Sequence, residues 1–101
     1  MKIIFAGTPK FASEHLSILL GGEHEIVAVL TQPDRKSGRG KKISFSEVKE
    51  IALENDLKVL QPASLKDVEI QKSINNLKPD IILVVAYGLL IPKTVLDMPK
   101  L

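Results

Sequence analysis

The stretch Ile3-Ile4-Phe5-Ala6-Gly7-Thr8-Pro9 decides how the chain begins to fold. Its first four residues form a short apolar run rich in strand-favouring side chains, which indicates a buried strand ending at Gly7. Thr8 offers an N-cap and Pro9 a first helical residue, so a helix should follow. The predicted apolar stripe of that helix comprises Ala12, His15, Leu16, Leu19 and Leu20. A strand that passes directly into a helix is typical of an α/β fold.

The same alternation continues along the chain. Three further segments have the composition of strands: Glu25–Leu30, Lys58–Leu60 and Ile81–Ala86. Helices are predicted before the last two of these strands, with capped starts at Ser44-x-x-Glu47 and Ser64-x-x-Asp67. One more helical turn is expected within Pro92–Asp97. Strands that alternate with helices favour a parallel sheet with right-handed crossovers. We therefore predict an α/β, Rossmann-like doubly wound parallel sheet of four strands in the order 3-2-1-4, with three crossover helices.

The last predicted strand makes this sheet look incomplete on its C-terminal side. Ile81–Ala86 is continuously apolar, as in strands that are covered on both faces. In the predicted order it would lie at an edge, and a flat apolar edge is an association hazard. We expect either that more chain follows Leu101 or that another molecule pairs with this strand, for example through self-association.

Composition restricts the class of protein. With 101 residues the chain is one domain at most. It contains no apolar run long enough to span a membrane, and its N-terminus does not resemble a secretory signal. Cysteine is absent, which excludes disulfides and thiol chemistry. A cytoplasmic location is therefore expected.

A basic loop follows the second predicted strand. The segment 35–42 contains Arg35, Lys36, Arg39, Lys41 and Lys42, whereas acidic residues outnumber basic ones over the rest of the chain. Gly38 and Gly40 flank Arg39, which leaves the backbone free to adjust to an anion. A solvated charged connection would also explain this composition. Long loops in compact domains are often functional, however, and several spaced cations suit a nucleic acid backbone.

Other motifs are less specific. A single glycine, Gly7, stands where a dinucleotide-binding turn would carry several, so such a site is disfavoured. Phe11 could belong to the core or to a pocket at the strand ends. His15 and His24 lack a second ligand at metal-binding spacing, and no metal cluster, carboxylate pair or nucleophile–histidine arrangement is evident. The residues predict a binding loop on a sheet, without catalytic residues of their own.

Four segments together resemble the methionyl-tRNA formyltransferases. They are Ile3–Ala12, Thr31–Lys42, Gln61–Leu65 and Val84–Pro92, and the similarity extends over the whole chain. The resemblance implies transfer of a formyl group from 10-formyltetrahydrofolate to the amino group of methionyl initiator tRNA, in translation initiation. No metal is implied.

The resemblance also implies roles for particular residues. Arg39 matches the family's principal tRNA-binding arginine, with Arg35, Lys41 and Lys42 as neighbours on the tRNA backbone. Phe11 matches a residue near the methionyl side chain. Four residues match part of the wall that accepts the folate: Ala86, Tyr87, Gly88 and Leu89.

One departure from the family pattern concerns catalysis. The family's catalytic Asn-x-His follows the match at Met98–Leu101, and its catalytic Asp and C-terminal tRNA-binding barrel lie further on. None of these is present in residues 1–101. Formyl transfer needs a base for the amine proton and donors for the oxyanion. We therefore expect this N-terminal portion of the formyltransferase domain to be inactive by itself, with no catalytic residue among its own.

Two alternatives stay open. A different folate-dependent formyltransferase, acting on a small or sugar substrate, would share the sheet but show no affinity for tRNA. A non-enzymatic RNA-binding module would bind RNA in a salt-dependent manner, without dependence on methionine or folate.

Overall fold

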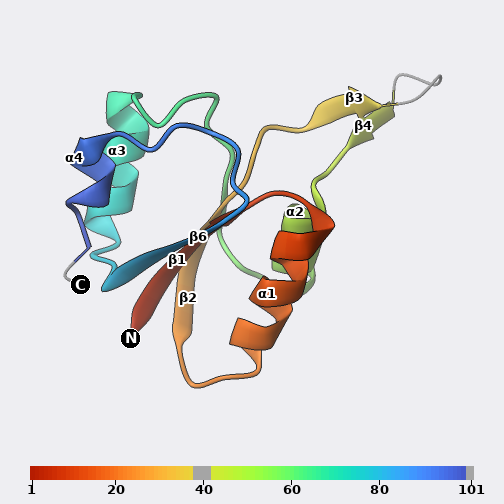
Figure 1. Ribbon diagram of the computed structural model, residues 1–101, viewed down its shortest axis with the longest axis horizontal. Helices are drawn as coiled ribbons and strands as arrows, with labels where there is room; N and C mark the ends of the chain where they lie inside the picture. The colour runs from red at the N-terminus through yellow and green to blue at the C-terminus, as the bar shows by residue number, and fades with distance from the viewer. Residues whose placement is uncertain (38–41, 100–101) are drawn as a thin grey trace.

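The computed structural model describes residues 1–37 and 42–99. Its centre is a four-stranded parallel sheet, which lies between the helices in Figure 1. The strands are β1 (Lys2–Gly7), β2 (Glu25–Leu30), β5 (Val59–Leu60) and β6 (Ile81–Val85). They lie in the order β5-β2-β1-β6. The predicted strand order 3-2-1-4 is confirmed.

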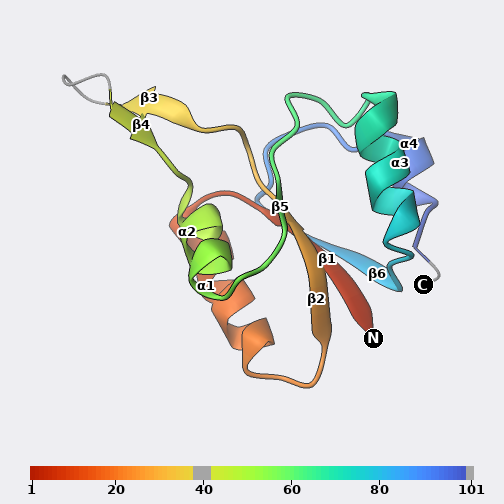
Figure 2. The same cartoon turned by 180° about the vertical axis from the view of Figure 1, so that it is seen from behind.

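Helices cover both faces of this sheet. Helices α1 (Lys10–Leu20) and α2 (Glu47–Glu54) pack on one face. Helices α3 (Val68–Asn76) and α4 (Lys93–Leu96) lie on the other, as Figures 1 and 2 show from opposite sides. Because a central parallel sheet is apolar on both faces, each face needs such a cover.

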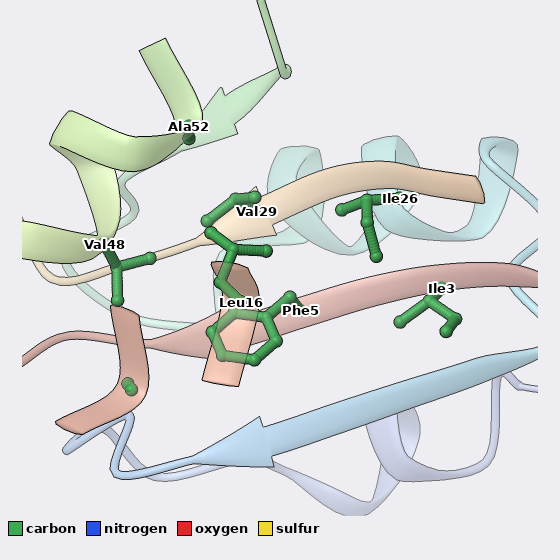
Figure 3. Packing of buried hydrophobic residues seen from close by; sticks show 8 residues of the cluster. Ile3, Phe5, Leu16, Ile26, Val29, Val48 and Ala52 are labelled. Carbon is green, nitrogen blue, oxygen red and sulfur yellow. The ribbon is translucent and has the colours of Figure 1, made fainter. Parts of the chain in front are cut away.

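Two apolar cores result from the alternation of side chains along the strands. Ile3 and Phe5 of β1 point toward α1 and α2, where Leu16 and Val48 meet them (Figure 3). Residues of the opposite parity point toward α3 and α4. The buried members of this second core are Ile4, Ala6, Ala28, Leu30, Leu65, Ile74, Tyr87 and Val95. Because side chains alternate along a strand, successive residues of β1 point into the two cores in turn.

A bulge interrupts this alternation in β2. Ile3 pairs with Ile26, but the next residue, Ile4, pairs with Ala28, so Val27 is an extra residue. As a result Ile26 and Val29 both reach the core under α1 and α2, although they are three positions apart. A bulge changes the phase of the side chains that follow it. The apolar pattern of residues 25–30 did not predict this bulge.

The basic segment differs from the loop that was predicted. Strands β3 (Arg35–Ser37) and β4 (Lys42–Ser44) form an antiparallel hairpin that projects away from the sheet and the helices (Figure 1). Three-residue strands without apolar alternation carry little sequence signal, which is why a loop was expected. Residues 38–41, including Arg39 and Lys41, lie outside the described residues.

The predicted helix caps also need correction. Pro9, rather than Thr8, occupies the N-cap position of α1. Ser46 caps α2 by accepting a hydrogen bond from the Lys49 amide, whereas Ser44 is the last residue of β4. Asp67 caps α3 in place of Ser64. Helices α1, α2 and α3 therefore begin one, two and three residues later than predicted, within the usual uncertainty of helix ends.

Strand β6 lies at an edge of the described sheet. Among the described residues it pairs with β1, and the Val84 side chain is 44% exposed. The edge position is as predicted, and β6 contributes side chains to both cores, but these side chains are only partly buried. No described helix is long and apolar enough to cross a membrane.

Candidate functional site

A cleft opens at the carboxyl edge of the parallel sheet, where β1, β2 and β6 end. Its volume is about 490 Å³, within the range of small-ligand sites. The lining residues are Thr8, Pro9, Gln32, Pro33, Ser44, Phe45, Ser46 and Ala86. They follow the strand ends or belong to the base of the hairpin. Open α/β sheets bind ligands at this edge, where neighbouring strands lead to helices on opposite faces.

Hydrogen bonds join the strand ends below the cleft. The Thr8 hydroxyl donates to the Tyr87 carbonyl at 2.9 Å. The Gln32 side-chain amide donates to the same carbonyl at 3.1 Å, and the Gln32 backbone N–H donates to the Thr8 hydroxyl at 3.3 Å. The residues that follow β1, β2 and β6 are therefore joined by hydrogen bonds, and these bonds fix the relative positions of the three strand ends at the floor of the cleft.

The turn after β6 has an unusual backbone. Ala86 has φ 50° and Gly88 has φ 90°, both in the left-handed region. This costs Ala86 conformational energy that a glycine would avoid. A Cβ atom at Gly88 would collide with the Gln32 side-chain nitrogen. Gly88 thus allows Gln32 to approach the turn and donate to it.

The predicted folate-binding residues divide between the cleft and the core. Ala86 is exposed and lines the cleft. The Tyr87 side chain is 2% exposed and lies in the core beneath α3 and α4, where Leu89 also packs. Burial raises the pKa of Tyr87 to about 12. Its hydroxyl has no hydrogen-bond partner among the described residues, so Tyr87 contributes to the cleft through its backbone carbonyl.

Phe11 is neither a core residue nor part of the cleft lining. Its ring is 61% exposed on α1 and lies 4.6 Å from the His15 ring, tilted by 57°. His15 Nδ1 is within hydrogen-bond distance of the Phe11 carbonyl, at 2.9 Å. His15 is exposed, so its predicted place on the apolar stripe is wrong. Phe11 lies in the first turn of α1, two residues after Pro9, which lines the cleft.

The base of the hairpin contains an ion pair. Lys49 Nζ on α2 donates to both Asp34 oxygens, at 2.9 and 3.1 Å, and Gln61 Nε2 donates to Asp34 Oδ1 at 2.7 Å. These bonds, foremost that from Lys49, lower the pKa of Asp34 below its ordinary value of 3.8. Asp34 and Gln61 belong to segments that resemble the formyltransferases. Nothing local in the sequence predicts that the Lys49 side chain contacts Asp34.

The structure describes the backbone of only some of the predicted tRNA-binding residues. The backbones of Arg35 and Lys42 lie in β3 and β4. Arg39 and Lys41 lie outside the described residues. The described cleft lining offers hydroxyl, amide and apolar groups but no acidic or basic side chain. The described residues therefore suit binding and orientation of a ligand, with cations on the adjoining hairpin.

Sheet order, cleft position and crossover helices define an α/β protein of the doubly wound class with a cleft at its strand ends. The sequence profile of formyl transferases matches residues 1–101, so the chain belongs to the formyl transferase family.

Relatives and a solved structure agree with this assignment. The chain is 56% and 55% identical to the methionyl-tRNA formyltransferases of two Pseudomonas fluorescens strains, and 54% identical to that of Ectopseudomonas mendocina. Each match covers 100% of this chain and 32% of the relative, so the chain spans about a third of their length. A phosphoribosylglycinamide formyltransferase from Bacillus halodurans superposes with a TM-score of 0.67 over 97% of this chain and 51% of that one. At 13% identity this likeness shows the fold alone.

Proposed function

We propose that this chain is the N-terminal portion of a methionyl-tRNA formyltransferase. In this proposal it holds methionyl initiator tRNA while the amino group of the methionine accepts a formyl group. The observation that carries the proposal is the meeting of the basic hairpin and the cleft at one edge of the sheet, since Ser44 belongs to both. A polyanion on the hairpin would bring its end to the cleft.

The cationic residues of the hairpin segment would bind the tRNA near its acceptor end. Arg35, Arg39, Lys41 and Lys42 stand within eight consecutive positions of the sequence. Contacts with phosphates release counterions and make affinity fall as salt rises. Arg39, between two glycines, is the residue whose loss should matter most. Phe11, exposed on α1, would contact the methionyl side chain.

The formyl donor would be 10-formyltetrahydrofolate, which supplies the activated formyl group. The turn 86–89 would form part of its binding wall through backbone groups and Ala86, because the Tyr87 ring is buried. A cleft of about 490 Å³ is large enough for part of such a ligand. The base and oxyanion donors of the reaction would come from residues outside 1–101, and a cytoplasmic location would suit this role.

Binding of methionyl initiator tRNA to the 101-residue chain tests the proposal. We expect salt-dependent binding that Arg39→Ala weakens about tenfold, with the slope of log affinity against log salt falling by about one. Lys72→Ala, an exposed lysine on α3, is the control that removes the same charge elsewhere. Equal affinity for unrelated RNA of the same length would favour the RNA-binding module instead. An absence of tRNA binding would favour a formyltransferase with a small substrate.

A formyl-transfer assay completes the test. The isolated chain, mixed with 10-formyltetrahydrofolate and methionyl-tRNA, should give no formylmethionyl-tRNA above background. Turnover by the chain alone would contradict the expectation that its catalytic groups lie elsewhere.

A further inference from the structure

The hairpin β3–β4 is joined to the rest of the chain by two short roots. The first root, residues 31–34, follows β2, and the second, residues 45–46, precedes α2. Figure 1 shows the hairpin clear of the sheet and of all four helices. Its direction relative to the cleft is therefore set where the two roots meet the body of the protein.

Three side chains from different elements meet at the first root. Asp34 accepts hydrogen bonds from Lys49 of α2 and from Gln61, which follows β5. Gln61 also donates to the Gln32 carbonyl at 3.2 Å, so it holds the root at two points. The exposed fractions of the Lys49 and Asp34 side chains are 13% and 26%, so this pair is shielded more than a surface ion pair.

The second root is held by the same lysine. The Lys49 ammonium lies 3.8 Å from the centroid of the Phe45 ring, a cation–π contact. Ser46 accepts a hydrogen bond from the Lys49 amide at 3.0 Å. The Ser46 and Thr31 hydroxyls are hydrogen-bonded to each other at 2.7 Å, which links the two roots directly.

We propose that Asp34, Lys49 and Gln61 form a positioning clamp that fixes the direction of the hairpin relative to the cleft. Lys49 reaches both roots, and Gln61 joins the first root to the end of β5. When tRNA binds, the clamp holds the cationic residues of the hairpin in the orientation that brings the acceptor end of the tRNA to the cleft. This consequence rests on the proposed function, whereas the clamp itself does not.

Charge and position predict opposite results for one substitution. Asp34 carries a negative charge at the base of a basic hairpin, so Asp34→Asn makes the surroundings more positive. If charge alone mattered, binding of a polyanion would become tighter. If Asp34 holds the hairpin in place, binding becomes weaker despite the added positive charge.

The first experiment uses the unliganded chain. Residual dipolar couplings and relaxation of the amides in β3 and β4 report how the hairpin is oriented and how far it moves relative to β1 and β2. Asp34→Asn and Lys49→Met should lower the order parameters of the hairpin while those of the sheet stay unchanged, and Lys49→Arg should preserve them. Glu54→Gln, at the exposed end of α2, is the control of equal charge change. An unchanged hairpin in Asp34→Asn and Lys49→Met would overturn the proposal.

The second experiment measures affinity for methionyl initiator tRNA. Asp34→Asn should weaken binding about fivefold, whereas Glu54→Gln should leave it unchanged or slightly tighter. The exchanged pair Asp34→Lys with Lys49→Asp should bind more tightly than either single variant, as a coupled pair requires. Tighter binding by Asp34→Asn would contradict the clamp. If the unmodified chain binds no tRNA, the proposed function fails, and the first experiment still decides the clamp.

Discussion

The Thr8 hydroxyl donates to the Tyr87 carbonyl at 2.9 Å, across 79 positions of the sequence. This bond joins the end of β1 to the turn after β6 below the cleft. Thr8→Val keeps the shape of the side chain but removes the hydroxyl, and with it the hydrogen bonds to the Tyr87 carbonyl and from the Gln32 N–H. We expect a loss of about 1–2 kcal/mol in the free energy of unfolding, measured with urea. Thr94→Val on the exposed face of α4 should cost less than about 0.5 kcal/mol.

Gly7, the last residue of β1, lies in close contact with β6 and α1. A Cβ atom there would stand 2.6 Å from the Val85 carbonyl oxygen and 2.7 Å from Ala12 Cβ. Backbone atoms cannot move aside cheaply, so Gly7→Ala should lower the stability by about 1–3 kcal/mol in urea unfolding. The matched control is Gly21→Ala, where the nearest atom, the Ile18 carbonyl oxygen, lies at 3.5 Å. Comparable losses in both variants would mean that crowding at Gly7 is not the cause.

The buried Tyr87 hydroxyl predicts a gain from its removal. Because it has no partner among the described residues, burying it costs free energy that Tyr87→Phe avoids. We expect Tyr87→Phe to leave the stability at pH 7 unchanged or to raise it by up to about 1 kcal/mol. A loss greater than about 1 kcal/mol would show that the hydroxyl has a stabilising partner.

The same tyrosine predicts a dependence on alkaline pH. Burial raises the pKa of Tyr87 from 10.0 to about 12 in the folded chain. Below pH 10 the phenol is neutral in both states, so its contribution to stability is fully present. Between about pH 10 and 12 the unfolded chain ionises first, and stability falls. Ultraviolet titration of the chain's single tyrosine measures this pKa directly, and Tyr87→Phe should lose less stability over the same range.

Asp34 predicts a dependence on acidic pH. Hydrogen bonds from Lys49 and Gln61 lower its folded-state pKa below 3.8. The carboxylate therefore stabilises the fold above about pH 4, and this contribution is lost as the pH falls through the lowered value. The amide signals of β3 and β4 should shift in that acidic range. In Lys49→Met the shift should occur at higher pH, and an unaltered midpoint would contradict the assigned cause.

The outer edge of β6 predicts association. Val84 is 44% exposed beside backbone groups that pair with no other described strand. Such an edge can pair with a second molecule. Light scattering should show a mass that rises with concentration, and Val84→Lys should suppress the rise. A monomer at all concentrations would contradict this prediction. Leu53→Lys, an exposed apolar residue on α2, controls for the added charge.

Much of the fold was predictable from local patterns. The boundaries of β2 and the four-strand order follow from apolar periodicity and the handedness of crossovers. The caps were less predictable, since Ser44 and Ser46 both suit an N-cap. Packing of the second root selected Ser46, which also bonds Thr31.

Sequence by itself therefore determined the succession of strands and helices, the two-sided sheet and the basic character of the segment after β2, because these depend on neighbours in the chain. Tertiary structure alone decided that Val27 bulges and that the Tyr87 ring turns inward. It also brought Lys49 and Gln61 to Asp34, from which they are 15 and 27 positions distant in the sequence. Such contacts form only when separate elements pack, so side-chain geometry, rather than local periodicity, selects them.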